Sequence, residues 1–290
     1  MGRRHTIGLG HLSAICRMDE KERLAFLDEG LHVILASAEG FWTAAEALGD
    51  QPREADVLDG FAREEAAKIL ILLDLHRCPK AHKAERIGTF VRWYYDHLAR
   101  LLYAAAVGWR PVTKGELRSY IDRERRSHVV DGPVGEWIMP AGPVVERERR
   151  LYADVERFDD HNLLWNVPRS WRERLQWAHI RRPDILNLAV AMRNLGFFTA
   201  EGLRIMSDVW GGQSLNDDLT RCDANDLKIR TLQAVEAAGA LPAEATDEDV
   251  QTLCQIWPFP MWDFNLRGID VPMDELEAER ERNLWNEAGY

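Results

Sequence analysis

A chain of 290 residues, 46% hydrophobic and 29% charged, has the composition of an ordinary globular protein and the length to bury a substantial core. Residues 217–290 carry 17 acidic and 6 basic side chains, which accounts for the whole net charge of −11, so residues 1–216 sum to zero. This balance excludes a broad basic surface for non-specific nucleic-acid binding, and any RNA contact must be local.

The sequence lacks the features that several other classes of protein require. The four cysteines lie far apart and form no CxxC pair, which argues against a disulfide scaffold or a zinc site and favours the reducing cytoplasm. No uncharged apolar run reaches the roughly 18 residues of a membrane span, and the N-terminus does not resemble a signal peptide. We therefore expect no membrane association. Neither a P-loop nor a dinucleotide fingerprint is present, so we also expect no cofactor.

Three long amphipathic helices are predicted in the first part of the chain. Apolar residues recur at steps of three and four over residues 18–48, 53–76 and 82–107, and the connections between these segments contain Gly and Pro. Long helices with short connections are typical of an antiparallel bundle. We therefore expect a helical bundle over residues 1–110.

The rest of the chain divides into two further parts. Residues 111–168 are rich in Gly and Pro and have short β-branched runs around Val129 and Val144, which predicts a loop-rich segment with short strands, one β-hairpin and a charged helix. Helical periodicity returns in residues 169–290, with a break near Gly196, and this region holds the acidic excess. The predicted fold class is all-α, with a helical C-terminal extension.

The second helix contains an acidic residue where an apolar one is expected. At 100° per residue, Glu65 falls in the middle of the apolar stripe of "GFAREEAAKILILLDLHR", whereas Glu64 lies further round and Lys68 lies at the edge. A buried carboxylate needs a partner, since an unpaired buried charge costs several kcal/mol. Pairing of Glu65 with Lys68 or Arg86 would make a structural clasp, and pairing with His97 would orient a catalytic base.

This helix resembles the EE-x-x-K helix of HEPN-fold proteins, and the whole chain resembles the AbiV family of bacterial abortive-infection proteins. The stretches that carry the resemblance are "GFAREEAAKILILL", "HKAERIGTFVRWYYDHLARLLYAAAVGWRP", "DGPVGEW", "VVERERRLYADV" and "WPFPMW". The resemblance implies a HEPN-like bundle and a homodimer. It also implies a metal-independent ribonuclease site in which an Arg precedes a His by four to six residues.

Two Arg/His pairs have this spacing. Arg92 and His97 lie within "RWYYDH", and Arg77 and His82 lie within "RCPKAH". A histidine can act as general base on a ribose 2′-hydroxyl, and an arginine can hold the phosphate and stabilise its developing charge. We favour the first pair because it sits late in the bundle, and we retain the second as an alternative.

Both pairs depart from the common pattern. The residue after the Arg is polar in many catalytic HEPN motifs, but here it is Trp93 or Cys78. On one regular helix Arg92 and His97 point about 140° apart, so they could converge only through a local distortion or across a dimer interface. Each histidine also has a structural interpretation, at the core margin for His97 and at a helix end for His82.

Two other segments are candidates for binding. Arg169, Trp171, Arg172 and Trp177 alternate cations with aromatic rings, a pattern that suits phosphates and stacked bases in single-stranded RNA. The alternative is an amphipathic helix with its tryptophans packed inward. "WPFPMW" is predicted to be a rigid aromatic strap packed on the helices, with a partner-docking surface as the alternative.

The sequence therefore supports two functional hypotheses. The first is a cytoplasmic anti-phage effector that cleaves RNA without a metal, using His97 as base and Arg92 as phosphate clamp, with Glu65 and Lys68 lining or bracing the site. The second is a non-catalytic protein of the AbiV type, which blocks the translation machinery or senses a phage protein through protein contacts.

Overall fold

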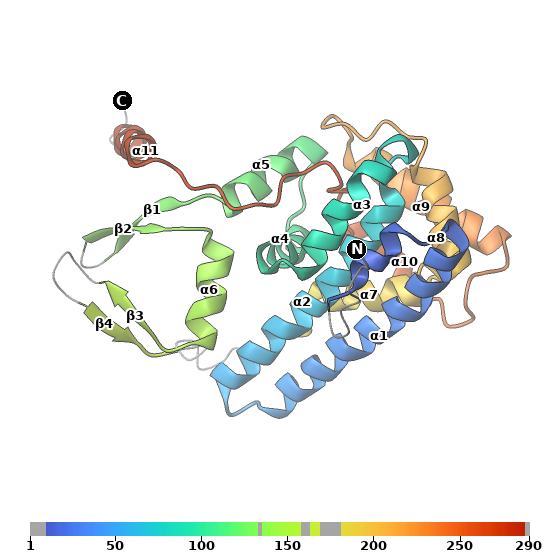
Figure 1. The fold of residues 1–290 in the computed structure, drawn as a ribbon, viewed down its shortest axis with the longest axis horizontal. Helices are drawn as coiled ribbons and strands as arrows, with labels where there is room; N and C mark the ends of the chain where they lie inside the picture. Colours follow the sequence, from blue (N-terminus) through green and yellow to red (C-terminus); the bar gives the residue numbers. More distant parts are fainter. Residues whose placement is uncertain (1–9, 133–134, 158–162, 169–180, 288–290) are drawn as a thin grey trace, which may run out of the picture.

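The computed structural model describes residues 10–132, 135–157, 163–168 and 181–287, and within them the fold is mostly helical, as predicted (Figure 1). The N-terminal helices are η1 (Leu12–Cys16), α1 (Glu20–Ala47), α2 (Pro52–Arg77), α3 (Lys80–Tyr95), α4 (His97–Gly108) and α5 (Lys114–Glu124). The later helices are α6 (Gly142–Leu151), α7 (Asp184–Asn194), α8 (Ala200–Trp210), α9 (Arg221–Ala237), α10 (Asp247–Ile256) and α11 (Met273–Glu287). Two antiparallel hairpins pair β1 (His128–Gly132) with β2 (Gly135–Met139) and β3 (Asp154–Arg157) with β4 (Leu163–Asn166).

The first two helices form the long antiparallel pair that the periodicity predicts. A capping box starts α1, because Asp19 accepts a hydrogen bond from the amide of Glu22 and the Glu22 side chain accepts one in return. α2 starts with Pro52, whose fixed φ and missing N–H suit the first helical turn. α2 then runs through the middle of the bundle and packs against α1, α3, α4, α7 and α8 (Figure 1).

The prediction of one helix over residues 82–107 is wrong, since the segment forms two helices. Asp96 has φ −85° and ψ 122°, which ends α3, and its carboxylate accepts a hydrogen bond from the Ala99 amide at 2.9 Å, which starts α4. An aspartate at this position is a strong N-cap because it satisfies an amide that the helix itself leaves unpaired. The break places Arg92 in α3 and makes His97 the first residue of α4.

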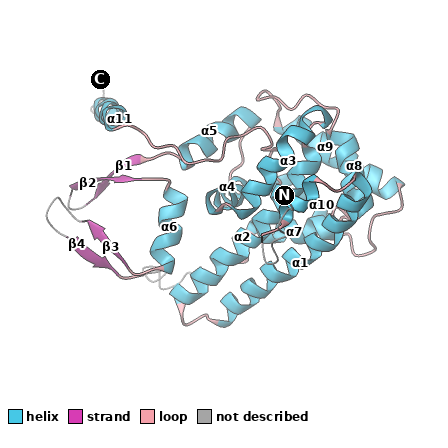
Figure 2. Cartoon of the chain, in the orientation of Figure 1, coloured by secondary structure: helices cyan, strands magenta, loops and turns pink. Residues whose placement is uncertain are grey.

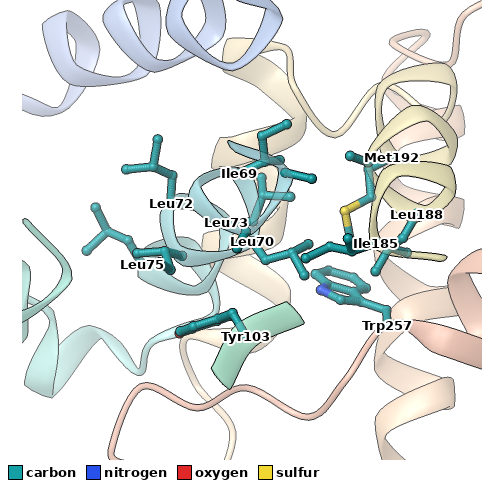
Figure 3. Packing of buried hydrophobic residues seen from close by; sticks show 14 of the residues in the cluster. Ile69, Leu70, Leu72, Leu73, Leu75, Tyr103, Ile185, Leu188, Met192 and Trp257 are labelled. Atoms are coloured by element: carbon teal, nitrogen blue, oxygen red, sulfur yellow. The ribbon is translucent and has the colours of Figure 1, made fainter. Parts of the chain in front are cut away.

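The hydrophobic core is centred on α2 and is shared by both halves of the chain. Figure 3 shows Leu70 and Leu73 of α2 beside Ile185 of α7 and Trp257 of the strap. One apolar cluster extends from Ile15 to Leu266, so the C-terminal helices are built onto the N-terminal bundle. The division of the chain into three parts stays a prediction. Its N- and C-terminal parts share one hydrophobic core.

The aromatic strap, residues 257–262, packs on the helices as predicted and is fixed by a buried polar network. Asp74 of α2 accepts hydrogen bonds from Tyr103 Oη at 2.9 Å and from the Met261 amide at 2.8 Å. Arg77 is buried, pairs with Asp74, donates to the Pro258 carbonyl at 2.8 Å and lies 4.1 Å from the ring centroid of Trp257. The network therefore joins α2, α4 and the strap.

The hairpins and α6 form an arm (residues 128–166) that projects from the helical body (Figure 2). The β-branched run at Val129 forms strand β1, whereas Val144 lies in the charged helix α6. α6 packs back against α2 and α4, and α11 packs beside β1. Within the described part of the arm, Trp165 is 76% exposed. Among the described residues, no helix has both the length and the apolar character to cross a membrane.

We expect Asp74→Ala to destabilise the protein by about 3–5 kcal/mol, because it leaves the buried Arg77 guanidinium without its carboxylate. Urea unfolding followed by circular dichroism measures the loss. Glu201→Ala is the control, since it removes an exposed carboxylate that pairs with Arg204 on the surface and should leave the midpoint unchanged. Equal effects of the two substitutions would contradict the structural role given to the Asp74 network.

Candidate functional site

The buried carboxylate of "EEAAK" is Glu64, so the prediction that Glu65 points along the core is wrong. The Glu64 side chain is 4% exposed, whereas Glu65 is partly exposed and pairs with Lys68 on its own helix. Lys68 also lies 5.2 Å from the ring centroid of Tyr94. The helical-wheel prediction assumes that one face of the helix is buried. α2 is instead covered on several sides, and α4 and α6 pack over the face that carries Glu64.

Three cationic or ionisable side chains meet Glu64. His97 Nδ1 is 2.7 Å from Glu64 Oε2, Arg147 Nε is 2.6 Å from Oε1, and Arg100 is 3.2 Å from Oε2. These four residues, named here the Glu64 cluster, come from α2, α4 and α6. The cluster therefore fixes the position of the arm's helix on the bundle.

Glu64 remains ionised at neutral pH despite its burial. Burial alone raises the pKa of the carboxyl group, but the hydrogen bonds from Arg147 and His97 and the positive charges of Arg100 and Arg147 together outweigh that effect and hold the pKa below its ordinary value. Arg147 has a raised pKa, because its ion pairs with Glu64 and Glu148 outweigh its own desolvation. The cluster is thus a carboxylate held between two permanent guanidinium charges.

His97 is held in a defined orientation while part of its ring faces solvent. Its side chain is 50% exposed, and Nδ1 points at the carboxylate of Glu64. A carboxylate at 2.7 Å favours the tautomer in which Nδ1 carries the proton and donates it. This tautomer leaves the Nε2 lone pair available, and no described residue forms a hydrogen bond with Nε2.

A second pair of contacts positions Arg147. Arg53 of α2 donates to the carbonyls of Arg150 at 3.3 Å and of Leu151 at 3.1 Å, at the C-terminal end of α6. A shallow depression lies along this seam between α2 and α6, and Glu64 and Arg147 form part of its wall.

The structure places the favoured Arg/His pair on two helices without a direct contact between them. Arg92 is exposed, and its guanidinium donates to Thr89 in the same helix at 3.0 Å. The guanidinium nearest His97 belongs to Arg100, whose terminal nitrogen is 3.1 Å from Nδ1. With the proton on Nδ1 both nitrogens are donors, so this approach is a contact between two neighbours of Glu64 and not a hydrogen bond. Arg100 also donates to the backbone carbonyls of Tyr95 and Asp96, which holds it across the break between α3 and α4.

The second pair is also separated. Arg77 is buried in the Asp74 network, and His82 is exposed and stacks on Trp262 with ring centroids 5.0 Å apart. Arg77 therefore has a structural role and is not available to a substrate. Arg169, Trp171, Arg172 and Trp177 lie outside the described residues.

Sequence reasoning missed Glu64, Arg100 and Arg147 as a group. The sequence contains a weak signal for Arg100. This arginine follows the candidate base His97 by three residues, and residues three apart on a helix are neighbours. No such signal exists for Arg147, since it is 83 residues from Glu64 in the chain. Among the described residues, no three His, Cys, Asp or Glu side chains come together as a metal site.

Comparison with known proteins adds no assignment to these observations. No protein-family model, no curated protein and no solved structure matches the chain. The resemblance to the AbiV family therefore stays an expectation from the sequence.

The adjacent residues Glu64 and Glu65 provide a matched test of the cluster. Glu64→Gln should cost about 2–4 kcal/mol of unfolding free energy, since two largely buried guanidinium groups lose their carboxylate. Glu65→Gln should cost about 1 kcal/mol or less, because it breaks one partly exposed pair with Lys68. Urea unfolding of both variants at pH 7 checks the difference, and a larger loss at Glu65 would contradict the structure.

The stabilising effect of Glu64 should also depend on pH. Its folded-state pKa is lowered, so its contribution is present above the unfolded-state value near 4.5 and is lost as the pH falls through the folded-state value. The stability difference between wild type and Glu64→Gln should therefore be full at pH 7 and shrink as the pH falls below 4.5. Unfolding curves across this range measure it, and a difference that grows in acid would overturn the assignment.

Proposed function

We propose that this protein is a metal-independent endoribonuclease that acts as a cytoplasmic anti-phage effector, with His97 as its general base. The observation that carries the proposal is the geometry of His97, in which a buried carboxylate holds Nδ1 at 2.7 Å and the ring is half exposed. A carboxylate that orients a histidine and fixes its tautomer is a recurrent device for activating a base.

The reaction needs no group beyond the chain and its RNA substrate. His97 Nε2 takes the proton of a ribose 2′-hydroxyl, and the 2′ oxygen attacks the adjacent phosphorus. The bond from phosphorus to the 5′ oxygen breaks, and that oxygen takes a proton from water. The products are a 2′,3′-cyclic phosphate and a 5′-hydroxyl, and His97 returns its proton to solvent.

Two arginines next to His97 supply positive charge where the phosphate gains negative charge. Arg100 and Arg147 both contact Glu64, and Arg147 also pairs with Glu148, so the two guanidinium groups are balanced by two carboxylates before RNA binds. A guanidinium group beside the reacting phosphate can still stabilise the charge that develops on it. Arg92, the clamp expected from the sequence, has an exposed guanidinium one helix earlier and stays a candidate for a more distant phosphate.

The biological setting of the proposal comes from the sequence resemblance. AbiV-type proteins are abortive-infection proteins, and a HEPN-like bundle implies a homodimer that acts on RNA or on the translation machinery. The "EEAAK" helix and "RWYYDH" carry this resemblance, and they contribute Glu64 and His97 to the cluster. The same two stretches thus support both the setting and the chemistry.

A second candidate function is a non-catalytic binding protein of the same type. The Glu64 cluster joins α2, α4 and α6, so it could serve only to dock the arm. The arm itself exposes Leu163, Leu164 and Trp165, the last by 76%. Exposed apolar side chains on a projecting hairpin favour protein contacts, such as those with a ribosomal or phage protein.

The test uses the purified full chain and a single-stranded RNA oligonucleotide in EDTA. We expect cleavage that yields 2′,3′-cyclic phosphate ends and that stops when the scissile nucleotide carries a 2′-deoxyribose. His97→Gln should lower the rate by about 10²-fold or more, because it removes the base. Thermal unfolding of the variant checks that the half-exposed substitution leaves the fold intact.

His82→Ala is the matched control, because it alters an exposed histidine that stacks on Trp262 away from the Glu64 cluster. It should cleave RNA at the wild-type rate. Unchanged cleavage by His97→Gln would eliminate His97 as the base. If wild type cleaves no RNA in the purified assay and none in cells under phage challenge, the binding function replaces the ribonuclease.

A further inference from the structure

A second depression lies beyond the opposite end of α4 from His97. It opens between the residues that follow α4, the first turns of α9, the end of α10 and the strap. Its wall includes Trp109, Arg110, Arg221, Lys228, Trp257 and Phe259. Twelve residues of α4 at about 1.5 Å each separate it from His97, so it is independent of the proposed ribonuclease site.

The charged side chains that line this pocket are all cationic. Arg110, Arg221 and Lys228 contribute three cations, and none of the described residues that line the pocket is acidic. A local concentration of positive charge beside aromatic rings is a feature that an anionic ligand would complement.

Lys228 differs from the other buried cations of the protein in its partners. Five buried Lys or Arg side chains occur among the described residues, and four of them pair with a carboxylate: Arg77 with Asp74, Arg100 with Glu64, Lys114 with Asp263, and Arg125 with Asp122. The ammonium of Lys228 donates only to neutral oxygens, which are Asn225 Oδ1 at 3.1 Å, the Cys254 carbonyl at 3.3 Å and the Trp257 carbonyl at 2.8 Å.

These contacts give Lys228 a structural role but leave its charge uncompensated. The Cys254 and Trp257 carbonyls lie at the C-terminal end of α10, where a cation is favourable. Burial, followed by the positive charges of Arg77 and Arg221, lowers the pKa of Lys228 to about 7. An anion seated in the pocket would balance this charge, as the carboxylates do for the other four buried cations.

We propose that this pocket binds the phosphate group of a small phosphate monoester. Arg110 is exposed at the mouth and makes no side-chain hydrogen bond to a described residue, so its guanidinium is available to the phosphate oxygens. Arg221 is held by the Pro111 carbonyl through Nε and one terminal nitrogen, which leaves its other terminal nitrogen for the ligand. Trp109 is 43% exposed and stacks on Tyr120, so it forms a rigid apolar wall beside the cations.

The experiment is calorimetric titration of the full chain with adenosine monophosphate, inorganic phosphate, adenosine and chloride at one ionic strength. We expect the monophosphate and inorganic phosphate to bind, and adenosine to bind at least tenfold more weakly than its monophosphate. Equal binding of adenosine and its monophosphate would overturn the phosphate assignment. Absence of binding by both phosphate compounds at millimolar concentration would overturn the site.

Variants locate the binding in this pocket. Arg110→Gln and Lys228→Met should each weaken phosphate binding by tenfold or more, whereas Arg230→Gln should bind like wild type because Arg230 is an exposed residue of α9 that does not line the pocket. If Lys228→Met fails to fold, the exposed Arg110→Gln decides the result. Wild-type affinity in Arg110→Gln, or an equal loss in Arg230→Gln, would place the binding elsewhere and refute the proposal.

Discussion

The structure depends on the burial of carboxylates on its central helix. α2 packs against helices from both halves of the chain, so Glu64 and Asp74 are buried and must be met by cations and hydrogen-bond donors. Asp74 is met by Arg77, Tyr103 and the strap, and Glu64 is met by α4 and α6. The two carboxylates therefore determine where the strap and the arm dock.

These two networks differ in solvent access. The closed network can only stabilise the fold, whereas the open one can also meet a substrate. The Asp74 network is closed, because Arg77 and Tyr103 are both fully buried and the strap covers them. The Glu64 cluster is open on one side, because His97 is half exposed at the first position of α4. A largely buried ion pair with a half-exposed histidine at its edge can present an oriented base while the charge that orients it stays almost covered.

The sequence predicted the helices better than the contacts between them. Periodicity located α1 and α2 within a few residues, and the Gly/Pro-rich middle segment contains the two hairpins. The break at Asp96 was missed because an apolar stripe continues across it, although aspartate is a good N-cap. Glu64 was missed for a different reason, since a helical wheel assumes one buried face and a central helix has several. Its partner Arg147 comes from 83 residues away, and no local pattern records such a pairing.

The distribution of charge constrains how RNA could reach His97. A chain with a net charge of −11 repels RNA at long range, and within a Debye length of about 8–10 Å only the local balance matters. At the Glu64 cluster two guanidinium groups face the carboxylate of Glu64 and that of Glu148, which pairs with Arg147, so the local balance is zero when His97 is neutral. A site without excess positive charge does not hold RNA non-specifically. A ribonuclease built on this site therefore needs its substrate positioned by other contacts, and the arm that supplies Arg147 is the element best placed to make them.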